Sequence, residues 1–157
     1  MQGQPSGRRR DTASRTISAD PDRIWQAFSD PESLMAWLPP GQMTGRALEY
    51  DFREGGRYRI ELTYDGSAGA GKTTGRTDIS AGRFLSLDPA KRLVQTVEFE
   101  SDDVAFAGEM RMTWSFEPVP QGTRVTITAE NVPPGISQAD HDAGLRGSLE
   151  NLANFLA

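Results

Sequence analysis

The sequence contains no cysteine and only one histidine among its 157 residues. The lack of cysteine excludes disulfide bonds, thiol nucleophiles, iron–sulfur clusters and zinc sites built on thiolates. One histidine cannot supply the two or three imidazole ligands that zinc and non-haem iron centres commonly use. We therefore expect no metal ion and no cofactor, and no residue is predicted to be catalytic. This composition favours binding over catalysis.

Long apolar runs are also missing. No stretch approaches the roughly 18 apolar residues of a membrane-spanning helix, and no apolar run follows Arg8, Arg9 and Arg10 as it would in a secretory signal. The chain has 17 Lys+Arg against 22 Asp+Glu, a net charge of −5, which disfavours binding to nucleic-acid phosphates. We expect a cytoplasmic protein with neither a nucleic acid nor a membrane as its partner.

The length of the chain suits one domain around one hydrophobic core, and neither a repeat nor a linker divides it. Residues 1–14 are polar and carry the arginine triplet, so they are predicted to form a flexible, solvated arm. Residues 15–157 are predicted to form the domain.

Two short helices are predicted near the N-terminus, because an Asp-Pro pair begins each of them. Asp20 and Asp30 can cap free backbone amides, and the proline that follows each suits the first helical position. Apolar residues then recur at helical spacing, and Pro39-Pro40-Gly41 ends the second helix. The apolar residues are Ile24, Trp25 and Phe28 in the first helix, and Leu34, Trp37 and Leu38 in the second.

From there to about residue 130 the apolar residues alternate with polar ones, which is typical of half-buried antiparallel strands. The alternation is clear over 58–64, 110–116 and 124–129, and weaker over 47–52, 83–87 and 93–99. Turn sequences rich in glycine and proline separate these segments. We expect six or seven strands in one antiparallel sheet.

The chain closes with a predicted amphipathic helix. Ser137 and Asp140 have the spacing of a capping box. A stripe of side chains then recurs at intervals of three and four residues: His141, Leu145, Leu149, Leu152 and Leu156. Helices segregated from an antiparallel sheet predict an α+β fold, in which a long helix lying across a curved sheet leaves room for a cleft.

Residues 66–73, Gly-Ser-Ala-Gly-Ala-Gly-Lys-Thr, match the phosphate-binding pattern G-x-x-x-x-G-K-[ST]. A phosphate-binding loop must continue into a helix that crosses over to a parallel strand. The residues after Thr73 are rich in β-branched side chains and glycine, and the surrounding pattern is antiparallel. We therefore interpret residues 66–75 as a hairpin loop that matches the motif through its composition, with nucleotide binding as the alternative.

Four stretches in this order resemble the family of Hsp-90 ATPase activator homologues (AHSA-type), within the START-like or SRPBCC superfamily. They are ISADPDRIWQAFSD at 17–30, PESLMAWL at 31–38, DFREGGRY at 51–58 and HDAGLRGSLENL at 141–152. The resemblance implies a helix-grip fold, in which a curved antiparallel sheet wraps around a long C-terminal helix and two short N-terminal helices precede it. The family commonly has tryptophan where this chain has Leu145.

The resemblance also implies a cavity between the sheet and the last helix. The residues predicted to line it are Trp37, Tyr58, Ile60, Leu62, Tyr64, Gln95, Met110, Met112, Trp114, Phe116, His141, Leu145 and Leu149. For most of them ordinary core packing is the alternative. His141 is either a polar anchor or general base in the cavity, or a hydrogen-bonded residue at its boundary. Gln95 either orients a ligand or bridges to the backbone.

The first function hypothesis is a non-enzymatic START-like protein that binds a small hydrophobic molecule in this cavity. The second is a polyketide-cyclase-like or hydrolase-like enzyme that uses His141 or a cavity tyrosine as acid and base. The third, from the resemblance alone, is a co-regulator of a chaperone ATPase. A homodimer is a further partner left open.

Overall fold

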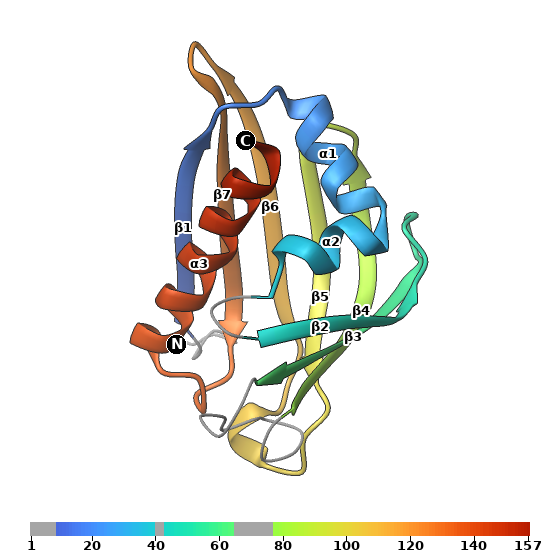
Figure 1. The fold of residues 1–157 in the computed structure, drawn as a ribbon. Coiled ribbons are helices and arrows are strands. Elements are labelled where there is room, and N and C mark those ends of the chain that lie inside the picture. The colour runs from blue at the N-terminus through green and yellow to red at the C-terminus, as the bar shows by residue number, and fades with distance from the viewer. Residues whose placement is uncertain (1–8, 40–42, 65–76) are drawn as a thin grey trace.

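The computed structural model describes residues 9–39, 43–64 and 77–157, which form one antiparallel sheet and three α-helices (Figure 1). Within these ranges the sheet has seven strands in the order β1-β7-β6-β5-β4-β3-β2, and α3 lies across its concave face. The predicted α+β helix-grip fold is confirmed. The strands are β1 (Arg9–Ile17), β2 (Met43–Tyr50), β3 (Arg57–Tyr64), β4 (Thr77–Asp88), β5 (Arg92–Phe99), β6 (Met110–Val119) and β7 (Gly122–Val132). The helices are α1 (Pro21–Ser29), α2 (Pro31–Trp37), the 3-10 turn η2 (Val104–Phe106) and α3 (Gln138–Leu156).

All three α-helices begin where the capping residues predict. The Asp20 carboxylate accepts a hydrogen bond from the backbone N–H of Arg23 at 2.8 Å, and Asp30 accepts one from Ser33 at 3.2 Å. The Ser137 hydroxyl accepts from the N–H of residue 140 at 3.0 Å. Each cap satisfies an amide that the first helical turn leaves unpaired. None of the described helices is long and apolar enough to cross a membrane.

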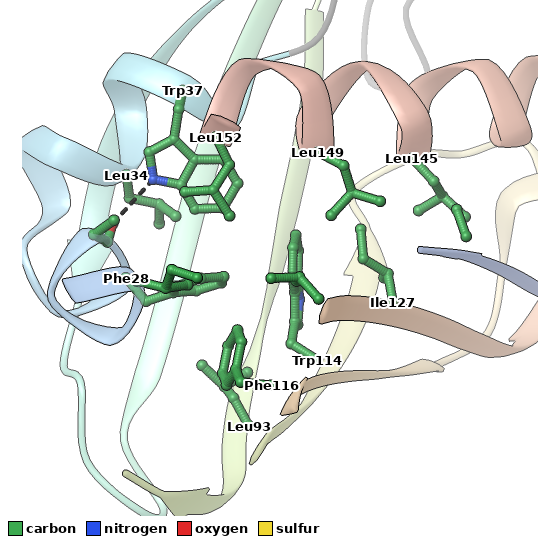
Figure 2. Close-up of a cluster of buried hydrophobic side chains, with 14 of the residues drawn as sticks. Phe28, Leu34, Trp37, Leu93, Trp114, Phe116, Ile127, Leu145, Leu149 and Leu152 are labelled. Atoms are coloured by element: carbon green, nitrogen blue, oxygen red, sulfur yellow. Dashed lines mark hydrogen bonds between the residues drawn. The ribbon is translucent and has the colours of Figure 1, made fainter. Parts of the chain in front are cut away.

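An aromatic cluster forms the core under α1, α2 and the second half of α3. Phe28 lies with its ring centroid 4.9 Å from those of both Trp37 and Trp114, in edge-to-face geometry that favours aromatic pairs. Figure 2 shows Leu149 and Leu152 projecting from α3 toward this cluster. The indole N–H of Trp37 donates to the carbonyl of Ala27 at 3.0 Å, so its burial leaves no donor unpaired.

Two side chains of α3 fix the helix to the chain that follows α2. The Ser148 hydroxyl donates to the carbonyl of Leu38 at 2.8 Å, and the Asn151 amide donates to that of Pro39 at 2.9 Å. These bonds join α3 to the end of α2.

The N-terminal segment differs from its prediction. Residues 9–14 were expected in a flexible arm, but they belong to β1, which pairs antiparallel with β7. Asp11 lies opposite Ala129 and Ala13 opposite Ile127, and all four are buried. The strand forms because β7 pairs with it from Asp11 to Ile17 and, past a shift in register, at Arg9, although its own sequence has few apolar residues.

The match to a phosphate-binding loop at residues 66–73 lies outside the described residues. The strands on either side of it, β3 and β4, pair directly with each other and are antiparallel. A phosphate-binding loop joins a strand to a crossover helix, and residues 77–88 continue as a strand instead.

Candidate functional site

A cleft of about 650 Å³ opens between the first half of α3 and the concave face of the sheet. Its apolar walls come from strands β2 to β6 and from η2, and α3 closes its other side. The described residues that line it are Leu38, Met43, Leu62, Tyr64, Asp78, Ser80, Val97, Phe99, Phe106, Met110, Met112, Gly135, Ile136, Asp140, His141, Gly144, Leu145 and Ser148.

Six of the thirteen residues predicted for the cavity lie in this cleft: Leu62, Tyr64, Met110, Met112, His141 and Leu145. The sheet register brings the strand residues together. Met110 lies opposite Val97 on β5, and Leu62 lies opposite Asp78 on β4. Leu145 is buried and marks the border between the cleft and the core.

The other seven predicted residues do not line the cleft. Five of them are packed in the core or at its edge: Trp37, Ile60, Trp114, Phe116 and Leu149. Helices α1 and α2 cover this part of the sheet (Figure 1), so side chains that share the concave face pack against helices there and not against open space. For these five residues, core packing is the role that the structure gives.

Tyr58 and Gln95 each form a side-chain hydrogen bond at the core. The Tyr58 hydroxyl donates to the carbonyl of Thr96, and burial raises the pKa of that hydroxyl well above its usual range. The Gln95 carbonyl oxygen accepts a hydrogen bond from the indole N–H of Trp114 at 3.1 Å. The Gln95 amide therefore orients a core aromatic residue, where the sequence suggested either a ligand contact or a bridge to the backbone.

The polar end of the cleft is built around His141 at the start of α3. Its Nδ1 lies 2.6 Å from Oδ2 of Asp11, whose side chain is 4% exposed. The Nε of Arg9 lies 3.1 Å from each Asp11 oxygen, and the same guanidinium donates to the carbonyl of Ile136. A buried carboxylate requires such partners, because it has lost its hydration.

A second polar group faces the same cleft from β3 and β4. Asp78 is buried, and its carboxylate interacts with the Tyr64 hydroxyl. Burial raises the pKa of Tyr64, and the negative charges of Asp78 and Asp140 raise it further. The Tyr64 hydroxyl therefore stays protonated near neutral pH.

A family model described as "Activator of Hsp90 ATPase homolog 1-like protein" matches residues 18–157. The chain belongs to the AHSA1-like family. No curated protein matches it.

Solved structures agree with this assignment. Protein CV1439 from Chromobacterium violaceum is 33% identical, with a TM-score of 0.82 over 92% of this chain and 94% of that one. A protein from Rhodobacter sphaeroides is 23% identical, with a TM-score of 0.78 over 99% and 96% of the two chains. An AHSA1-like protein from Aeromonas hydrophila is 17% identical, with a TM-score of 0.71 over 94% and 92%. The last two likenesses show the fold alone.

In this AHSA1-like chain the sequence did not reveal Asp11 or Arg9, the two residues that hold His141. Both fall in the segment that was predicted to be an arm. The available signal was a weak alternation, since Asp11, Ala13 and Ile17 are buried while Thr12 and Ser14 are exposed. The sequence does not reveal Asp78 and Ser80 either, because the alternation that predicts a strand here covers only residues 83–87.

The cleft of this AHSA1-like protein combines a flexible apolar wall with a few polar groups at one end. Two methionines on alternate positions of β6 can adapt their shape to different ligands. The charged side chains among the described lining residues are acidic, and none of these residues is a lysine or an arginine. Such a site can hold an apolar molecule and orient it through one or two hydrogen bonds.

Proposed function

We propose that this AHSA1-like protein binds a small, largely apolar molecule in the cleft between α3 and the sheet. The observation that carries the proposal is the cleft itself, which has apolar walls and convergent polar groups next to a densely packed core. Its volume of about 650 Å³ falls within the roughly 300–1,000 Å³ of small-molecule sites.

Gly144 supports the proposal from the helix side. It lines the cleft, and a Cβ atom added to it would meet no atom within 4 Å. Glycine in a helix interior costs stability relative to alanine, and here no close approach to the sheet explains it. The missing side chain leaves open the space that a ligand would occupy.

The test uses the neutral lipophilic dye N-phenyl-1-naphthylamine and two tryptophan variants. Gly144→Trp places an indole in the cleft, whereas Ala143→Trp places it on the exposed side of the same helix. We expect the dye to bind the wild type and Ala143→Trp equally, and to bind Gly144→Trp at least tenfold more weakly. Absence of dye binding to the wild type, or equal binding to both variants, would contradict the proposal.

A second function, acid and base catalysis, is favoured by the hydrogen bond between His141 and the buried Asp11. A carboxylate that orients one ring nitrogen leaves the other available to take a proton from water that attacks an ester. The test is hydrolysis of p-nitrophenyl butyrate by the wild type and His141→Asn. Turnover that is unchanged in the variant, or no faster than with free imidazole, would exclude this role.

Chaperone regulation and a homodimer stay predictions from the sequence. Stimulation of a bacterial Hsp90 ATPase by the purified protein tests the first of them. Sedimentation at several protein concentrations tests the second.

A further inference from the structure

The tautomer of the His141 ring follows from its hydrogen-bond partner. The Nε–H group of Arg9 donates to both oxygens of Asp11, at 3.1 Å each, so both oxygens act as acceptors. A carboxylate only accepts hydrogen bonds, so the 2.6 Å contact between His141 Nδ1 and Asp11 Oδ2 is donated by Nδ1. In the neutral ring the proton therefore sits on Nδ1, and Nε2 carries a lone pair.

His141 lines the cleft, and its Nε2 atom is the ring nitrogen that is not bonded to Asp11. The His141 side chain is 13% exposed and lines the cleft, and Nε2 lies on the edge of the ring opposite the bond to Asp11. Among the described residues, Nε2 makes no hydrogen bond of its own. An acceptor at the end of an apolar cleft is complementary to a ligand that offers one donor.

The charged residues around the cleft indicate whether the ligand group that donates the hydrogen bond is neutral or charged. Among the described residues, His141 contacts Asp11, which pairs with Arg9 on β1, and it shares the lining of the cleft with Asp140 on α3 and with Tyr64 and Asp78 on the opposite strands. Asp78 and Asp140 repel a ligand carboxylate. Asp78 and Asp140 attract an ammonium group, but such a group has to give up its strong hydration to enter between Met110, Met112 and Leu145, and this cost opposes the attraction.

We propose that the ligand of this cleft is an apolar molecule with a neutral hydroxyl group, which donates a hydrogen bond to Nε2 of the neutral His141 ring. This inference rests on the proposed function. It adds a polar anchor, with Asp11 and Arg9 as the positioning residues that fix the tautomer of the ring.

Four naphthalene derivatives of similar size test the proposal by isothermal titration. They are 2-naphthol, 2-methylnaphthalene, 2-naphthoate and 2-(aminomethyl)naphthalene. One hydrogen bond corresponds to about fivefold or more in affinity, so we expect 2-naphthol to bind at least about fivefold more tightly than 2-methylnaphthalene. We expect 2-naphthoate and the ammonium compound to bind more weakly than 2-naphthol.

His141→Asn is the matched variant. Its amide keeps an N–H near the position of Nδ1, toward Asp11, but provides no acceptor at the position of Nε2. We expect the preference for 2-naphthol over 2-methylnaphthalene to disappear in this variant, so that the two compounds bind with equal affinity. Equal binding of the two compounds to the wild type, a preference that survives His141→Asn, or tightest binding of either charged compound would overturn the anchor. If none of the four compounds binds, the proposed function fails as well.

A direct readout of the tautomer is simple because the chain has a single histidine. The imidazole ¹⁵N spectrum of the labelled protein at alkaline pH contains the signals of one ring. We expect a protonated Nδ1 and an unprotonated Nε2, and a shift of the Nε2 signal when 2-naphthol is added. A ring that carries its proton on Nε2 would overturn the proposal, even if the compound binds.

Discussion

Asp11 is the residue on which the polar end of the cleft depends. Its carboxylate is buried on the concave face of β1 and accepts hydrogen bonds from Arg9 and His141. Its burial is tolerated because both neighbours compensate for its lost hydration, and removing Asp11 takes this partner from both of them. The same contacts fix β1 and the start of α3 to each other.

Replacing Asp11 by alanine therefore destabilises the protein. We expect the free energy of unfolding to fall by about 3 kcal/mol, because Arg9 and His141 lose a shared buried acceptor. The control is Ser14→Ala on the exposed face of the same strand, where a change within about 0.5 kcal/mol is expected. Urea denaturation measures both. Equal effects of the two substitutions would show that the Asp11 contacts contribute little.

The tyrosines give a prediction for alkaline pH. The chain has three, and burial raises the pKa of Tyr50, Tyr58 and Tyr64 above the ordinary 10.0. Because the folded-state pKa is raised, the neutral hydroxyls stabilise the fold fully below pH 10.0, and this contribution is lost as the pH rises further. We expect the ultraviolet absorbance of tyrosinate to appear above pH 10.0 in the native protein, together with unfolding. In urea the three residues should titrate near 10.0, and a native titration at that same pH would contradict their burial.

At the scale of elements, α3 keeps a glycine where packing does not require one. Gly144→Ala should raise the free energy of unfolding by up to about 1 kcal/mol, because alanine favours the helix and its methyl group meets nothing within 4 Å. Gly82→Ala is the contrasting variant, since its Cβ would lie 1.9 Å from the backbone oxygen of Thr96 and must force β4 away from β5. Thermal unfolding should separate the two in opposite directions. A destabilised Gly144→Ala would mean that α3 cannot accept the methyl group.

The elements also show what a sequence can and cannot predict. Helix starts at Asp20, Asp30 and Ser137 were predictable because a cap is a bond between residues close in sequence. Strand β1 was not, because it depends on pairing with β7, more than a hundred residues away. Because Asp11 lies in β1, it is also absent from the site that the sequence predicts. A charged residue at a buried strand position has no local signature.

The division between core and cleft was also beyond the sequence. Alternation placed Met112 and Trp114 on the same face of β6 correctly. Which of them faces a cleft is decided by where α1 and α2 lie over the sheet, and these helices cover Trp114 while leaving Met112 at the cleft. Seven of the thirteen residues predicted for the cavity therefore lie outside the cleft.

At the scale of the whole molecule, one curved sheet serves two purposes. Under α1, α2 and the C-terminal half of α3, the concave face of the sheet packs against an aromatic core. Under the N-terminal half of α3, the same face forms the wall of the cleft. The methionines and the helix glycine give the cleft an adaptable lining. This arrangement leads to the central claim, that the cleft is the binding site for a small apolar molecule.

The methionine methyl groups test this claim most directly. Met43, Met110 and Met112 line the cleft, whereas Met35 on α2 does not. In protein labelled with ¹³C at the methionine methyls, titration with 2-methylnaphthalene should shift the signals of the three cleft methionines and leave that of Met35 nearly unchanged. The shifts should disappear in Gly144→Trp and persist in Ala143→Trp. A titration that moves none of the three signals, or moves only that of Met35, would contradict binding in the cleft.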